Sequence, residues 1–132
     1  MDIRSVVQFL EYWDSLRSRT RRVVTCIPPE RLEWTHRVGA FTLGDLVRHL
    51  ATIERHMYAE AKAIIGALTD ADLQRKCQTP AGTAITTWKW LRAMCEHEAH
   101  HRGQIYLMLG MLEVATPPLY GLTSEEVRAR SA

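Results

Sequence analysis

Apolar residues recur at helical spacing along most of this chain, and this periodicity constrains the fold more than any other feature. Residues 3–26 carry one such stripe, which Pro28-Pro29 stops, and Thr42 begins a second helix as its N-cap. A long helix is expected over residues 83–113, and a short C-terminal one after a capping box at Thr123. No stretch has a credible strand pattern or an internal repeat. The sequence therefore predicts an all-α protein, most simply a helix bundle.

The composition is that of a single globular domain spanning residues 1–132. A chain of 132 residues suffices for one core but not for two. Hydrophobic residues make up 46% and charged residues 24%, as in ordinary globular proteins, and the formal net charge is only +2. So weak a charge gives no reason to expect nucleic acid as a partner. No apolar run approaches the ~18 residues of a membrane-spanning helix, so no membrane partner is expected either.

The N-terminus and the cysteines indicate a cytoplasmic location. Asp2, Arg4 and Glu11 interrupt the first apolar residues, which argues against a secretory signal. The chain has 3 cysteines, an odd number, and no two of them form a C-x-x-C motif. This usage fits a reducing compartment better than a disulfide framework. None of the cysteines lies in a sequence context that identifies it as a nucleophile.

Residues 96–104, EHEAHHRGQ, carry the strongest indication of chemistry. His97 and His101 lie one helical turn apart, so their rings share a face and can converge on one cation. Two imidazoles are one fewer than the three protein ligands usual in an open catalytic metal site, and His49 on the preceding helix is the natural third. All three fall on stripes predicted to face the interior, where unsatisfied ring nitrogens are costly. A metal ion would satisfy them; core histidines hydrogen-bonded to backbone or water are the alternative.

Charged residues near this motif are expected at the surface. Glu96 and Glu98 could orient an imidazole, but surface charge is the better interpretation on so polar a helix. Arg102 and Gln104 are open between a role at the site or in a subunit contact and a solvated position. A basic run on the first helix is interpreted as a solvated face rather than a phosphate site. It consists of Arg17, Arg19, Arg21 and Arg22.

Residues 97–101 also match the H-E-x-x-H motif of zinc peptidases, in which Glu98 would act as general base. The extended form of this motif fails, because Gly103 comes one place early and position 107 is leucine. Glu125 or Glu126 lies at the distance at which other such enzymes place a glutamate ligand. The sequence shows no strands for a substrate-binding sheet, so we disfavour the peptidase hypothesis.

Residues 96–104 and residues 43–50, LGDLVRHL, together resemble the DinB/YfiT-like superfamily of metal-binding four-helix bundles. The tail at residues 117–123, PPLYGLT, resembles one branch of this superfamily. The most specific part of the resemblance is the H-x-x-x-H-R-G-Q stretch. The resemblance implies an up-down-up-down four-helix bundle, a small-molecule substrate and a homodimer.

The resemblance also implies that His49, His97 and His101 hold a divalent metal ion, commonly zinc or nickel. Characterised relatives include thiol-dependent S-transferases and a maleylpyruvate isomerase, which use bacillithiol, mycothiol or glutathione. We therefore expect a metal-dependent enzyme that activates a small thiol cosubstrate. The alternatives are a metal-dependent hydrolase that uses a metal-bound water, and a non-catalytic bundle that binds a metal or a ligand. Neither the catalytic residues nor the identity of the metal follows from the sequence.

The segment after the second helix departs from this family pattern. Residues 58–68, YAEAKAIIGAL, continue a helical pattern without a turn signal, yet residues 59–68 resemble the third helix of the family. Helices of an antiparallel bundle cannot reverse direction without a loop. Either the two helices are fused and the bundle is completed by exchange with another subunit, or a loop is missing near residues 57–60. We favour the missing loop.

Overall fold

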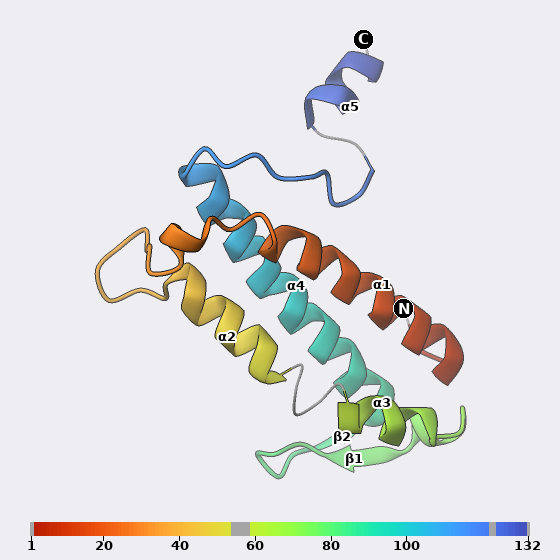
Figure 1. Ribbon diagram of the computed structural model, residues 1–132. Helices are drawn as coiled ribbons and strands as arrows, with labels where there is room; N and C mark the ends of the chain where they lie inside the picture. Colours follow the sequence, from red (N-terminus) through yellow and green to blue (C-terminus); the bar gives the residue numbers. More distant parts are fainter. Residues whose placement is uncertain (1, 54–58, 122–123, 132) are drawn as a thin grey trace.

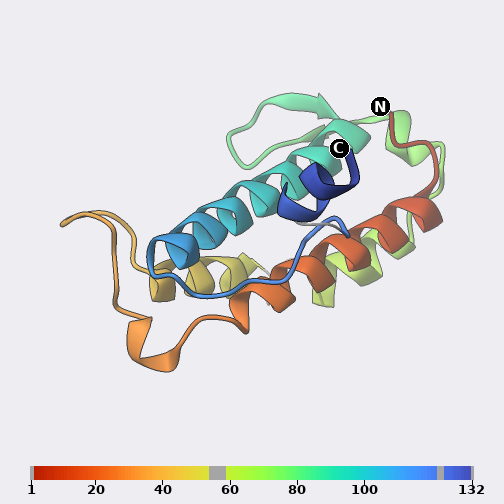
Figure 2. The ribbon, with the colours of Figure 1, turned by 90° about the horizontal axis from the view of Figure 1, so that it is seen from above.

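The computed structural model of this chain describes residues 2–53, 59–121 and 124–131, and it is mostly helical (Figure 1). Three helices, α1, α2 and α4, lie side by side, and shorter elements close one end of the body (Figures 1 and 2). The helices are α1 (Val6–Val24), α2 (Leu43–Ile53), α3 (Ala59–Gly66), α4 (Thr87–Met111) and α5 (Ser124–Ser131). The short elements are the 3-10 turns η1 (Pro29–Arg31) and η3 (Asp72–Gln74) and the strands β1 (Lys76–Gln78) and β2 (Ala84–Thr86).

Helices α1 and α4 run parallel to each other, and α2 runs antiparallel to both (Figure 1). Arg17 of α1 meets Glu98 of α4, and one turn further along both helices Thr20 meets Arg102. Between α1 and α4 the chain passes through α2, α3 and the two strands, and α4 therefore begins at the same end of the body as α1. An up-down-up-down bundle would instead set its first and last helices antiparallel. The structure therefore does not show the predicted alternation of helix directions.

A two-stranded antiparallel hairpin precedes α4, and no pattern in the sequence predicts it. Strand β1 pairs with β2 so that Cys77 lies opposite Ile85. The connecting turn uses Gly82 at a φ of 77°, a left-handed conformation that favours glycine. Strands of three residues are too short to display a period of two in the sequence. The predicted long helix therefore begins at Thr87, and the predicted all-α class is corrected to a mostly helical fold with a small sheet.

The hydrophobic core consists of two clusters that follow one another along α4. The first cluster joins the N-terminal halves of α1 and α4 to α3 and η3, and the second joins their C-terminal halves to α2. Leu43, Leu46 and Leu50 hold α2 in the second cluster, each at most 5% exposed. Because His49 directly precedes the buried Leu50, its side chain lies at the edge of the α2–α4 contact.

The N-cap predicted at Thr42 is confirmed, and with Asp45 it forms a reciprocal capping box. The backbone N–H of Asp45 donates to Thr42 Oγ1 at 3.0 Å, and the backbone N–H of Thr42 donates to Asp45 Oδ2 at 3.0 Å. Asp45 also accepts from Arg48 at 2.7 Å. The hydrogen bond from the Thr42 backbone, followed by those from Arg48 and the Thr42 hydroxyl, lowers the pKa of Asp45 to about 2. The carboxylate thus anchors the helix that carries His49.

Replacing Asp45 with alanine should destabilise the protein by an amount that depends on pH. A carboxyl whose pKa is lower in the folded state stabilises that state above the unfolded pKa of 3.8, and this contribution is lost as pH falls towards 2. The stability difference between the wild type and the variant should be constant from pH 7 to about pH 5 and should shrink by pH 3. Urea unfolding at each pH measures it. A difference that grows on acidification would contradict this account of the cap.

Two predicted features lie outside the described residues. The connection from Ile53 of α2 to Ala59 of α3 is one of them, so the fused helix or missing loop near residues 57–60 stays a prediction. Thr123 of the C-terminal capping box is the other. Within the described part of the chain, no helix combines the length and the apolar character needed to cross a bilayer.

Candidate metal centre

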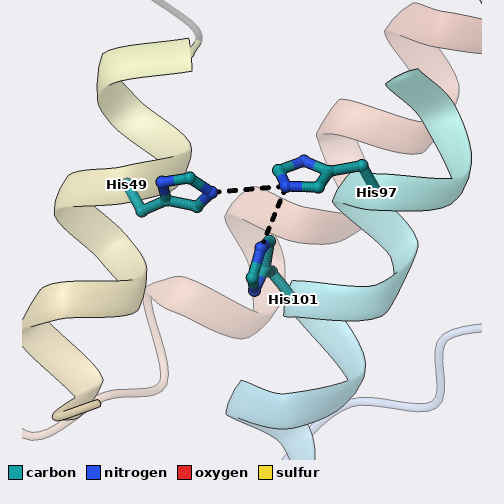
Figure 3. A group of neighbouring side chains, drawn as sticks. All are labelled: His49, His97 and His101. Atoms are coloured by element: carbon teal, nitrogen blue, oxygen red, sulfur yellow. Dashed lines mark hydrogen bonds between the residues drawn. The ribbon is translucent and has the colours of Figure 1, made fainter. Parts of the chain in front are cut away.

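Three histidine rings meet where α2 passes α4 (Figure 3). His49 comes from α2, and His97 and His101 come from successive turns of α4. The Nε2 atom of His97 lies 3.3 Å from Nε2 of His49 and 3.1 Å from Nε2 of His101. The ring centroid of His49 lies 5.2 Å from that of His97 and 4.7 Å from that of His101, and the centroids of His97 and His101 are 4.5 Å apart. The structure thus brings together the three side chains that the sequence singles out.

The spacing of these nitrogens suits a metal ion. A tetrahedral zinc ion with Zn–N bonds of ~2.0–2.1 Å places neighbouring ligand nitrogens about 3.4 Å apart. The two measured Nε2 separations are 3.1 and 3.3 Å, and one ligand atom from each residue lies within 4.8 Å of the other two. Three neutral imidazoles leave further coordination positions open for water or a substrate. The His49–His97–His101 triad could therefore hold a divalent ion.

Gln104 fixes the orientation of one ring of the triad. Its Oε1 lies 2.6 Å from Nδ1 of His101. An amide oxygen can only accept, so Nδ1 of His101 donates and carries the ring proton. The opposite nitrogen, Nε2, then has a free lone pair, and it is this atom that faces His97. Such a partner for the distal nitrogen is typical of metal-binding histidines.

Replacing Gln104 with alanine should weaken zinc binding by roughly 10–100-fold, because His101 would lose the group that holds its tautomer and ring orientation. Competition with a chromophoric chelator at pH 7.5 measures the dissociation constant. The matched control is Gln74→Ala, since Gln74 is an exposed glutamine on η3. Equal affinities of the two variants would show that Gln104 does not support the site.

The triad lies at an accessible edge, so the prediction that its rings face the interior is wrong. His49 and His97 are exposed and His101 is partly buried. Helix α4 instead buries the adjoining face, and the triad lies on the flank that faces α2. The buried residues of α4 are Trp88, Leu91, Cys95, Glu98, Arg102, Ile105, Met108 and Leu109. An edge position leaves a path for a small molecule from solvent.

The protonation state of His97 also favours metal binding. Loss of water around its ring lowers the pKa of His97, and the adjacent rings of His101, His49 and His100 lower it further because like charges repel. His97 is therefore neutral, as a ligand must be, at neutral pH and somewhat below it. His100 lies beside His101, with ring centroids 5.1 Å apart, but it is not among the described groups whose ligand atoms converge.

Glu98 does not take part in the site, and the prediction that it is a surface charge is also wrong. It is 4% exposed and accepts a hydrogen bond of 2.9 Å from Arg17, itself 5% exposed. The solvated-face interpretation of the basic run therefore fails at Arg17, although Arg21 and Arg22 are exposed. A carboxylate bound to a buried guanidinium cannot act as the base of an H-E-x-x-H peptidase, which removes the structural basis of that hypothesis.

Arg102 is a second buried polar contact between α4 and α1. It is 3% exposed and donates to the carbonyl of Leu16 at 3.2 Å and to the hydroxyl of Tyr120 at 3.2 Å. The guanidinium of Arg19 also lies over the ring of Tyr120, 5.5 Å from the ring centroid. Arg102 thus ties the C-terminal tail to the body instead of facing solvent. Glu96, in contrast, is exposed as predicted and pairs with Arg92 at 3.1 Å.

Comparison with known proteins finds one family model and a solved structure that are similar to this chain. A family model described as the DinB superfamily matches residues 55–105, which include His97 and His101. The crystal structure of a DinB-like protein from Bacillus cereus superposes with a TM-score of 0.73, over 89% of this chain and 99% of that one. The family match and the shared fold support a DinB family protein. Among curated proteins, the comparison found no match.

The comparisons bear on the fold of this protein and not on its activity. The Bacillus cereus protein is 19% identical, so the similarity establishes a shared architecture alone. His49 lies outside the range that the family model matches, and its place in the triad depends on the structure. Gln104, near the end of the matched range, is one of the residues whose role the sequence left open.

Proposed function

We propose that this protein is a metal-dependent enzyme that activates a small thiol, with His49, His97 and His101 as ligands of a divalent ion, zinc or nickel. The observation that supports this most directly is the meeting of three Nε2 atoms at an accessible edge. When bound, the ion would supply Lewis acidity that lowers the pKa of a coordinated thiol or water. The protein's own part is to present neutral, oriented ring nitrogens, and Gln104 does this for His101.

The thiol would have to come from a cosubstrate, because no cysteine of the chain is suited to the role. Burial raises the pKa of Cys95 to about 12, and the charges of Glu98 and Glu96 add to the effect. Cys26 donates its Sγ–H to the carbonyl of Arg22 at 3.2 Å. Cys77 lies on β1, and no described cysteine converges with the triad.

The carboxylates around the site favour thiol activation over hydrolysis. Hydrolytic metal sites commonly use a carboxylate as general base towards water. Glu98 is buried against Arg17, and Asp45, one turn before His49, has a pKa of about 2 and is too weak a base. A thiol is already acidic enough to ionise through coordination alone. A thiol cosubstrate therefore suits these surroundings better than an attacking water does.

Elemental analysis of protein purified without chelator, followed by turnover assays, tests this proposal. Zinc- or nickel-loaded protein should conjugate a small thiol to an epoxide or halogenated electrophile, and the activity should vanish without the ion or in His101→Ala. Ester or amide turnover without added thiol would replace the proposal with a hydrolase. A large stabilisation by metal with no turnover would replace it with a non-catalytic bundle.

The homodimer that the resemblance implies stays a prediction. Trp88, a large aromatic residue at the start of α4, is 8% exposed and belongs to the first core cluster. Its ring is also flanked by the guanidinium of Arg92, 5.3 Å from the ring centroid. A dimer would therefore have to use other residues, and sedimentation velocity of the metal-loaded protein determines whether it forms.

A further inference from the structure

A pocket of about 440 Å³ lies beside the triad, between the loop that precedes α2 and the facing turns of α2 and α4. Its size falls within the ~300–1,000 Å³ typical of small-molecule sites. The loop contributes His36, Arg37 and Phe41, α2 contributes Asp45 and Leu46, and α4 contributes Gln104 and Met108. Its lining therefore combines a cationic loop with apolar side chains from three segments.

The pocket adjoins the proposed metal centre through residues that lie about one helical turn from the triad on both helices. Gln104, which lines it, accepts the hydrogen bond from His101 at 2.6 Å. Asp45, on the opposite wall, precedes His49 by one helical turn, which is an axial rise of about 6 Å. A molecule of modest length held in the pocket would thus extend towards the three ring nitrogens.

Arg37 is the cation that this pocket leaves available. Its guanidinium makes no hydrogen bond or ion pair with any side chain of the described part of the chain. Asp45, the nearby carboxylate, is already occupied by Arg48 at 2.7 Å and by the amide of Thr42. An arginine without a carboxylate partner at the rim of an apolar pocket is suited to binding an anion.

The backbone presents Arg37 on an ordered turn. The carbonyl of Arg37 accepts from the amide of Ala40 at 3.0 Å and from the hydroxyl of Thr35 at 3.1 Å. Gly39 has a φ of +79°, as the third position of a type II turn requires. The side chain thus projects from a fixed point, which reduces the entropy lost when it binds a ligand.

We propose that this pocket selects the substrate, and that the substrate is a small organic carboxylate with an apolar body. This inference rests on the proposed function, since it places the reactive end of the substrate at the metal centre. Arg37 would pair with the carboxylate, while Leu46, Met108 and the exposed ring of Phe41 would contact the apolar body. A monoanion fits better than a phosphate dianion, because Asp45 also lines the pocket and adds a negative charge to it.

NMR titration of the zinc-loaded protein with 3-phenylpropionate, and separately with its neutral analogue 3-phenylpropionamide, tests whether the pocket selects a carboxylate. The carboxylate should bind the wild type at least tenfold more tightly than the amide, since hydrogen bonds to a charged group contribute ~1.5–3 kcal/mol. Arg37→Gln should abolish this preference and Arg37→Lys should retain part of it. Arg31→Gln is the matched control, because Arg31 is exposed on η1 and does not line the pocket. Equal binding of the two ligands, or loss of the preference in Arg31→Gln, would overturn the inference.

Exchange of zinc for paramagnetic cobalt tests the link to the triad. Protons of the bound 3-phenylpropionate should relax faster in the cobalt protein than in the zinc protein, and phenyl phosphate should bind less tightly than the carboxylate. Binding with no cobalt-dependent relaxation would show that the pocket does not serve the metal centre. Metal binding by the triad without carboxylate selection would overturn this inference and leave the proposed function standing. Selection by Arg37 in a protein that binds no metal would support the pocket and overturn the proposed function.

Discussion

His97→Ala should lower zinc affinity by roughly 100-fold or more. Structural zinc sites with four ligands have apparent binding free energies of ~10–16 kcal/mol, so one ligand contributes about 3 kcal/mol. His97 is also the central member of the triad, because its Nε2 lies 3.3 Å from His49 and 3.1 Å from His101. Its removal would leave only two imidazoles, those of His49 and His101, to bind the ion. Calorimetric titration with zinc at pH 7.5 measures the effect.

The matched control is His100→Ala, which deletes a neighbouring imidazole of the same helix that is exposed and outside the convergent group. This variant should keep its zinc affinity within a few-fold of the wild type. Zinc at 100 times its dissociation constant should also stabilise the wild type by about 2.7 kcal/mol and His97→Ala by far less. Undiminished affinity of His97→Ala would show that the three rings do not act as one site.

The triad could be predicted from the sequence because each of its members follows a local rule. Imidazoles at positions 97 and 101 share a helix face by spacing alone, and the capping box at Thr42 places His49 near the middle of α2. Local rules do not determine which flank of α4 turns towards α2. The sequence predicts a surface position for Glu98 and leaves Arg102 open, whereas the structure turns both inwards.

The inward polar residues were beyond prediction because their partners are far away in the chain. Glu98 meets Arg17 across 81 positions and Arg102 meets Leu16 across 86, and neither pair leaves a periodic signal. The hairpin at 76–86 was missed for the opposite reason, since its strands are too short for any period to appear. Arg37 of the pocket has no motif of its own, and its relevance depends on the loop geometry.

Glu98→Ala should be the most destabilising single change outside the hydrophobic core, by about 3–5 kcal/mol, because it breaks one side of a buried ion pair. The side chains of Arg17 and Glu98 are only 6% and 5% exposed and lie 2.9 Å apart. Urea unfolding of the metal-free protein measures the loss. The matched control is Glu96→Ala. Glu96 pairs with Arg92, whose side chain is 46% exposed, so this substitution should lower the free energy of unfolding by less than about 1 kcal/mol.

A double variant separates the cost of breaking the pair from the value of having it. Arg17→Met combined with Glu98→Leu removes both charges and fills similar volumes, so most of the stability lost in Glu98→Ala should return. Glu98 directly follows His97 on α4 and lies on the buried face next to the triad, so the pair also fixes the rotation of α4 against α1. If the double variant regains stability but binds zinc more weakly than the wild type does, then the ion pair positions the metal centre. If the double variant matches the wild type in both stability and zinc affinity, the ion pair serves stability alone.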